Sequence, residues 1–347
     1  MSHAIQRLTV ALVISLCPAL SPGQIRSMEQ DPSLNNLVHG EGYRMGPPDG
    51  CGHVEKRGAG PIPLVLIPGG GFSWEVFESF MGRHEKEYTM FAVSLAGMGG
   101  TPAPPMPPEG TSYGEQTWLR GAIRALLRLL EEERLERPLL LTHFLEGSQI
   151  GLRMAIDHPE RIRGVVLVSG SAKFVQPGRD FTREERIRYM DERMAPQWFK
   201  TVTLRTWNDN NFPASTYSRD PELAARLFAQ VSEGPLPVVI RYLLEFHAAD
   251  LAAEFSDIEA PALLLSPGFP ETMLRDEATS WLPYFFTDGW KGIERNPRVE
   301  RVVVDDARIL LWLDQPERVD VEISRFVDEL SAREPQLPKI SRSRFWR

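Results

Sequence analysis

The chain has 347 residues, of which 42% are hydrophobic and 25% are charged, so it can bury a full core in one or two domains. Its 47 acidic residues outnumber its 39 basic residues and give a formal net charge of -8. An acidic surface of this kind argues against nucleic-acid backbones and anionic membranes as partners. Small molecules and proteins remain as the expected partners.

The N-terminal segment, residues 1–23, has the pattern of a secretory signal peptide. A polar start with one basic residue, Arg7, precedes an apolar run over residues 8–16, and helix-breaking Pro and Gly residues follow. We therefore predict export to the periplasm or the extracellular space. The alternative is an N-terminal helix of a cytosolic protein. No later apolar run reaches the length of a membrane span.

Strand and helix patterns alternate through the first half of the chain. Residues 24–50 are polar and loop-like, and the fold begins near Cys51. Apolar runs without polar alternation are typical of strands that are buried on both faces of a parallel sheet. Predicted strands lie at 51–58, 63–67, 90–94 and 164–168, another begins at Leu139, and the predicted helices lie at 74–84, 117–134 and 149–158. Residues 102–110 carry five prolines and predict a loop.

The composition changes after the strand at 164–168. The residues that follow are aromatic and rich in Arg and Asp, and their pattern is helical without strand alternation. We predict that residues 172–255 form a helical cap inserted over the sheet. The next clear strand, at 260–265, returns the chain to the core.

The core is expected to comprise residues 51–171 and 256–333. Its last elements are a strand at 299–304 and a helix at 316–330, and residues 334–347 predict a basic tail. The repeated strand–helix order predicts an α/β fold with a doubly wound, mostly parallel sheet and an inserted helical cap.

Four segments, in this order, resemble motifs of the α/β-hydrolase superfamily. They are PLVLIPGGGF at 63–72, AVSLAGMGGT at 92–101, HPERIRGVVLV at 158–168 and DQPE at 314–317. The resemblance covers about residues 50–330 and implies the fold of that superfamily. It does not by itself imply an activity, because one fold can carry many functions.

The resemblance places the nucleophile elbow within PLLLTHFLEGS at 138–148, where a sharp strand-to-helix turn presents a catalytic serine in active members. Alignment with the family motif before the turn puts Phe144 at the nucleophile position. Alignment with the family motifs after the turn puts Leu145 there. Neither side chain has a hydroxyl, a thiol or a carboxylate, so neither can attack a carbonyl.

Glycines usually flank the nucleophile because the backbone and the helix approach closely there. The flanking residues are Thr142 and Glu146 if Phe144 holds the position, and His143 and Gly147 if Leu145 does. Non-glycine residues in such a geometry cost on the order of 1–3 kcal/mol each. We therefore predict that the turn is relaxed relative to an active elbow.

The partners of a catalytic serine are also missing from their expected places. None of the seven histidines follows the last predicted strand, and the position of the histidine base is occupied by Ile309. Glu271 stands in the region where the family carries its acid. Three residues remain as weak candidates for a rearranged site: Ser148, His247 and Glu271.

Three consecutive glycines after the first parallel strand predict a pocket of backbone amides that could bind an anion. The expected pocket residues are Gly69, Gly70, Gly71, Phe72, Glu146 and Gly147. A tight turn without a ligand is the alternative. No metal-ligand spacing and no nucleotide-binding motif is present, so we predict no metal and no cofactor.

Three functions are consistent with these residues. The first is a protein of the α/β-hydrolase fold that lacks a Ser-His-Asp triad and binds a small apolar or carboxylate-bearing molecule between sheet and cap, or acts as a scaffold. The second is an enzyme with a rearranged site, either a hydrolase that uses Ser148 with a cap residue such as His247, or a non-hydrolytic catalyst such as a lyase or a cofactor-free oxygenase. The third is a protein-binding face on the aromatic cap, with an unidentified partner.

Overall fold

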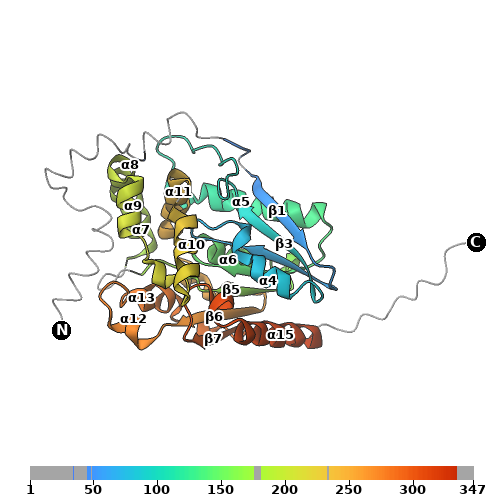
Figure 1. The fold of residues 1–347 in the computed structure, drawn as a ribbon. Helices are drawn as coiled ribbons and strands as arrows, with labels where there is room; N and C mark the ends of the chain where they lie inside the picture. Colours follow the sequence, from blue (N-terminus) through green and yellow to red (C-terminus); the bar gives the residue numbers. More distant parts are fainter. Residues whose placement is uncertain (1–33, 35–44, 48, 176–180, 233, 334–347) are drawn as a thin grey trace, which may run out of the picture.

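The structure is a computed structural model that describes residue 34 and residues 45–47, 49–175, 181–232 and 234–333. Figure 1 shows a central sheet with helices on both faces and a group of helices beside one end of it. The predicted signal peptide, the predicted basic tail and most of the predicted loop-like segment lie outside the described residues. None of the helices described is both long and apolar enough to cross a membrane.

The sheet has seven strands in the order β1-β3-β2-β4-β5-β6-β7. Only β1 pairs antiparallel, with β3, and the other neighbours are parallel. The strands are β1 (Cys51–Arg57), β2 (Ile62–Ile67), β3 (Tyr88–Leu95), β4 (Leu139–His143), β5 (Gly164–Val168), β6 (Ala262–Gly268) and β7 (Val299–Asp305). This sheet confirms the predicted α/β fold class.

The central strands are apolar because helices cover both faces of the sheet. Every residue of β4 and of β5 is buried. The core helices are α4 (Glu78–Arg83), α5 (Thr117–Glu132), α6 (Leu145–Asp157), α14 (Leu311–Asp314) and α15 (Pro316–Arg333). Helix α6 begins at Leu145, earlier than the predicted start at residue 149, and its first eight residues are all buried.

Between β5 and β6 the described chain is helical. These elements are α7 (Arg183–Tyr189), a π-helical turn (Met190–Met194), α8 (Ala195–Thr201), α9 (Leu204–Asn210), α10 (Pro221–Ser232) and α11 (Leu236–Ala248). They gather beside the sheet in Figure 1. Every residue of α11 is buried, so this helix is the main contact between the cap and the core.

Two further short helices, α12 (Glu271–Arg275) and α13 (Leu282–Phe286), connect β6 to β7. Neither was predicted. Both are five residues long, too short for a helical repeat to be visible in the sequence.

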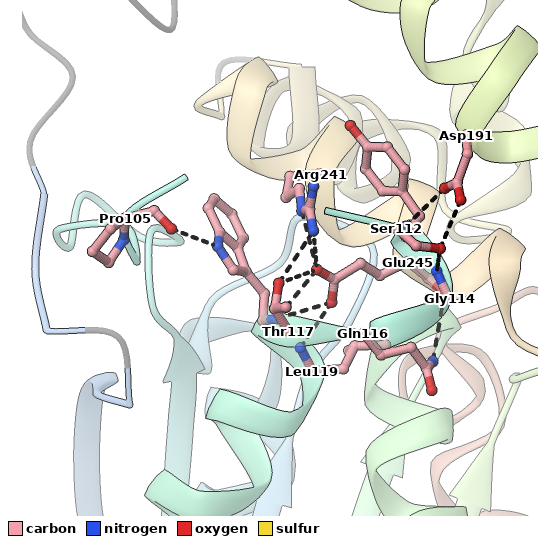
Figure 2. A network of polar contacts seen from close by, with 11 residues as sticks. Pro105, Ser112, Gly114, Gln116, Thr117, Leu119, Asp191, Arg241 and Glu245 are labelled. Carbon is pink, nitrogen blue, oxygen red and sulfur yellow. Dashed lines mark hydrogen bonds and ion pairs between the residues drawn. The ribbon is translucent and has the colours of Figure 1, made fainter. Parts of the chain in front are cut away.

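The carboxylate of Glu245, on α11, caps the N-terminus of α5 (Figure 2). It accepts hydrogen bonds from the amides of Trp118 and Leu119, each at 3.0 Å, and from the Thr117 hydroxyl at 3.0 Å. The first amides of a helix have no partner within the helix, and an anion is favoured there. The residue before α5, Gln116, forms no side-chain cap of its own. A cap helix therefore completes a core helix.

Arg241 balances the charge of Glu245. Its guanidinium donates to Glu245 Oε1 from Nη2 at 2.8 Å and from Nε at 3.0 Å, and both side chains are buried. The guanidinium also lies 4.2 Å from the centre of the Tyr113 ring. The backbone amide of Tyr113 in turn donates to Asp191 of the π-helical turn at 2.8 Å (Figure 2). The cap is thus joined to the start of α5 by a continuous polar network.

We expect the substitution Glu245→Ala to lower the free energy of unfolding by about 3–5 kcal/mol, because it leaves Arg241 buried and unpaired. It also leaves two amides of α5 without an acceptor. Urea denaturation followed by circular dichroism measures the loss.

The matched control is Glu271→Ala. Glu271 forms an ion pair with Arg275 at the same i,i+4 spacing, but both side chains are more than three-quarters exposed. Such a pair contributes at most about 1 kcal/mol. Equal losses in the two variants would show that the buried pair does not hold cap and core together.

Candidate functional site

The turn between β4 and α6 keeps the strained conformation of a nucleophile elbow. Phe144 has φ 57° and ψ 155°, and Leu145 has φ 27°. The prediction of a relaxed turn is therefore wrong. Phe144 lies at the apex, directly after the last residue of β4.

Packing holds this turn in place. The Phe144 amide donates to the carbonyl of Val168 at 3.0 Å, and the Phe144 carbonyl accepts from the amide of Ser148 at 3.0 Å. The ring is 1% exposed and stacks on Phe286, with the ring centres 5.7 Å apart. Full burial of a phenylalanine side chain contributes about 1.5–3 kcal/mol, which is enough to offset a strained φ of about 1–3 kcal/mol.

The ring of Phe144 also lies against the glycine-rich loop. A Cβ atom on Gly70 would collide with the edge of this ring, and Gly70 has φ +68°. Only glycine satisfies both conditions without strain. The loop and the apex of the turn are therefore packed directly on one another.

Glu146, in the first turn of α6, bonds to the same loop. Its Oε1 accepts a hydrogen bond from the amide of Gly70 at 2.9 Å, and the residue is 2% exposed. Burial raises the pKa of Glu146 to about 7, and hydrogen bonds from its own amide and from those of Gly70 and Gly71 limit the rise. The predicted anion-binding amides thus already have a carboxyl group of the chain beside them.

A cavity of about 80 Å³ lies between the elbow, the cap and α13. Eight aromatic residues line it: Phe144, Phe174, Trp198, Trp207, Phe212, Tyr217, Trp281 and Phe285. The other polar residues of the lining are Glu146, Asn211 and His247. Its wall is therefore mainly apolar, with few groups that could orient a ligand.

His247 contributes a neutral imidazole to this wall. The residue is 5% exposed, and its Nδ1 has no hydrogen-bond partner among the described residues. Burial lowers the pKa of His247 to about 3, and the charge of Arg186 lowers it further. The Phe174 ring lies 4.4 Å from the imidazole, centre to centre.

The second buried histidine, His143, lies at the end of β4 and not in the lining of the cavity. Its Nε2 lies 3.2 Å from the carbonyl oxygen of Ile309, and burial lowers the pKa of His143 to about 3. Ile309 itself is fully buried. Phe72 packs on the same imidazole, with ring centres 5.8 Å apart.

Ser148 and His247 are not brought together. Ser148 lies within α6 and does not line the cavity, and its buried hydroxyl has no hydrogen-bond partner in the described part of the chain. It packs against Gly170, where a Cβ would collide with the hydroxyl. Glu271 does not line the cavity either, and its side chain is 78% exposed and pairs with Arg275.

Two of the predicted pocket glycines serve close packing. An ideal Cβ on Gly69 would lie 2.8 Å from the amide of Gly147, and one on Gly147 would lie 2.8 Å from the carbonyl of Pro68. Both distances are shorter than a Cβ tolerates. These glycines let the loop and α6 approach each other, while the cavity wall itself contains Gly70 and Glu146.

Of the eight aromatic residues that line the cavity, only Phe144 was predicted from the sequence as a site residue. Trp281 and Phe285 belong to the segment WLPYFF at 281–286, whose aromatic content is the one signal that could have indicated a contact with the cap. No group of three or more His, Cys, Asp or Glu side chains within the described ranges could hold a metal ion. The absence of a metal and a cofactor stays a prediction.

The parallel sheet, the strained turn after β4 and the helices inserted after β5 together define a protein of the α/β-hydrolase fold. The chain belongs to the alpha/beta hydrolase family, which it matches over residues 64–321. No curated protein matches it.

Solved structures with this fold share little sequence with the chain. A hydrolase from Pseudomonas aeruginosa PA01 is 18% identical, with a TM-score of 0.59 over 79% of this chain and 93% of its own. A thermophilic esterase from Thermogutta terrifontis is 18% identical, with a TM-score of 0.57 over 80% and 93%. The enol-lactonase from Burkholderia xenovorans LB400 is 18% identical, with a TM-score of 0.56 over 80% and 96%. At this identity the likeness shows the fold alone.

The raised pKa of Glu146 makes the stability of the protein depend on pH. The variant Glu146→Gln removes this contribution, because glutamine does not ionise. In the unfolded chain the carboxyl ionises with its ordinary pKa of 4.5, whereas in the folded protein it stays protonated up to about 7. Raising the pH through this window therefore favours unfolding of the wild type. We expect the stability of Glu146→Gln, relative to the wild type, to rise by about 3 kcal/mol between pH 4.5 and 7 and to stay level above it.

Urea denaturation at a series of pH values measures this difference, in which the contributions of His143 and His247 cancel. Glu254→Gln serves as a control of opposite sign, because a hydrogen bond from Arg153 lowers the pKa of Glu254. Its stability relative to the wild type should fall as the pH rises and become level above about 4.5. A pH-independent difference for Glu146→Gln would contradict the buried carboxyl.

Proposed function

We propose that this protein binds a small molecule in the aromatic cavity and does not hydrolyse esters through a Ser-His-Asp triad. The observation that carries the proposal is Phe144, whose ring occupies the apex of the elbow and lines the cavity. In an active member this apex would present the nucleophile to the substrate. Here it presents a hydrocarbon surface.

The other requirements of acyl transfer support the same conclusion. A hydrolase needs a base within hydrogen-bond reach of its nucleophile and free amides that stabilise an oxyanion. Ile309 stands in place of the base, and Glu146 accepts the hydrogen bond that Gly70 would give to an oxyanion. A substrate oxygen would have to displace this carboxyl.

A lyase with a rearranged site is the second candidate, and one observation favours it. Glu146 lines the cavity and has a pKa of about 7, which suits general acid or base catalysis. The hydrolytic activity of the esterase and the enol-lactonase belongs to those proteins, and their likeness in fold does not transfer it to this chain. Export of the protein remains a separate proposal that rests on residues 1–23.

A fluorophosphonate probe tests for an activated serine. We expect no covalent labelling of the purified protein by intact-mass spectrometry, and no turnover of p-nitrophenyl acetate above that of denatured protein. A known serine esterase provides the positive control. One labelled serine per chain, or ester turnover that is lost in Ser148→Ala or His247→Ala, would overturn the proposal.

Toluene, a small apolar probe, tests the cavity itself. Trp198, Trp207 and Trp281 line the cavity, so binding should change the intrinsic fluorescence. We expect Val239→Phe, which fills the cavity, to weaken toluene binding at least about tenfold, the equivalent of 1.4 kcal/mol. The control is Val303→Phe, because Val303 is 49% exposed and does not line the cavity. Equal binding by both variants would place toluene elsewhere.

A further inference from the structure

Among the described residues, Glu146 is the only carboxylic acid in the cavity wall, and this wall contains no Lys or Arg. No basic side chain in the described part of the chain forms an ion pair with it, and its hydrogen bonds come from backbone amides alone. A buried carboxyl group in a folded protein is usually either paired with a positive group or protonated. The chain therefore holds an acidic group in an apolar space without supplying its counterion.

The remainder of the wall suits a cation. Eight aromatic rings surround the space, and the face of an aromatic ring carries the negative part of its quadrupole, which attracts positive charge. His247 is neutral and does not compete as a cation, because burial lowers its pKa to about 3. The backbone amides of Gly70, Gly71 and Glu146 donate to this carboxyl group, which has about four acceptor positions, so acceptor capacity remains for a ligand.

We propose that the cavity binds a small organic cation, a quaternary ammonium group, with Glu146 as its counterion and the aromatic rings around its methyl groups. This inference rests on the proposed function and names its class of ligand. It adds a charge requirement that binding of an apolar molecule would not impose.

The scarcity of hydrogen-bonding groups favours a quaternary over a primary ammonium group. A primary ammonium group has three N–H donors to satisfy. Besides Glu146, the side chains of the wall that could accept a hydrogen bond are His247, Tyr217 and Asn211, and the side-chain oxygen of Asn211 already accepts from the amide of Phe212 at 2.8 Å. A quaternary ammonium group has no N–H donor, so burial in an aromatic wall leaves nothing unpaired.

The volume favours a compact group. The cavity of about 80 Å³ is smaller than the engineered cavity of about 150 Å³ that is known to bind benzene. Toluene and a trimethylammonium head are both about as large as benzene or larger, so either one requires movement of the lining side chains, and the volume does not distinguish between them.

Choline and 3,3-dimethyl-1-butanol form the matched probe pair, because they have the same shape and differ in one atom, nitrogen or carbon, and hence in charge. Their affinities for the full chain are measured at about pH 8, where Glu146 is ionised, by isothermal titration and by tryptophan fluorescence. We expect choline to bind at least about tenfold more tightly than its neutral isostere. Glu146→Gln, which keeps an acceptor for Gly70, should abolish this preference, and Glu271→Gln should retain it.

The outcomes distinguish failure of the cation proposal from failure of the proposed small-molecule binding. If 3,3-dimethyl-1-butanol binds as tightly as choline, or if toluene binds and choline does not, the cation is excluded while a small-molecule cavity stands. If none of the three probes binds, both the cation and the proposed function are overturned. A preference for choline that persists in Glu146→Gln would remove Glu146 as the counterion. If Glu146→Gln does not fold, the affinities of the wild type for choline and 3,3-dimethyl-1-butanol still test whether the cavity prefers a cation.

Discussion

The contact between Phe144 and Gly70 organises the centre of this molecule. A phenylalanine at φ 57° persists only where its surroundings hold it, and here the ring is enclosed by the glycine loop on one side and by Phe286 on the other. The position that usually faces a substrate thus becomes part of the hydrophobic core and of the cavity wall at once.

The loop amides and Glu146 form a second constraint on the same turn. The carboxyl group reaches Gly70 because α6 begins at Leu145 and brings its first turn under the loop. Backbone strain at Phe144 and burial of the carboxyl group of Glu146 are both unfavourable, and the two residues are only two positions apart. Unfavourable features of this kind concentrate at functional sites in many proteins.

Much of the fold could be predicted from the sequence. The buried strands β4 and β5 contain apolar runs at 139–141 and 165–168, and runs of this kind are typical of strands that are buried in a parallel sheet. The landmarks on either side also limited the elbow to Phe144 or Leu145. The conformation of that turn was not predictable, because it depends on packing against Phe286, which lies far along the chain.

The cavity also could not be predicted from local sequence patterns. The hydrogen bond between Gly70 and Glu146 joins residues 76 positions apart, and the wall combines the elbow, the cap and α13. Local patterns carry no information about which distant segments meet. Trp281 and Phe285 were therefore missed, although their aromatic neighbours in the cap were noted as unusual.

The capping of the N-terminus of α5 by Glu245 also affects whether the inserted segment and the sheet can exist as separate folding units. Helix α5 lies in the core, yet its first amides find their acceptor on α11, which belongs to the segment inserted between β5 and β6. Excising that segment would fray a helix that remains behind. Insert and sheet should therefore melt in a single cooperative transition, and evolution could exchange the insert only together with a new acceptor for α5.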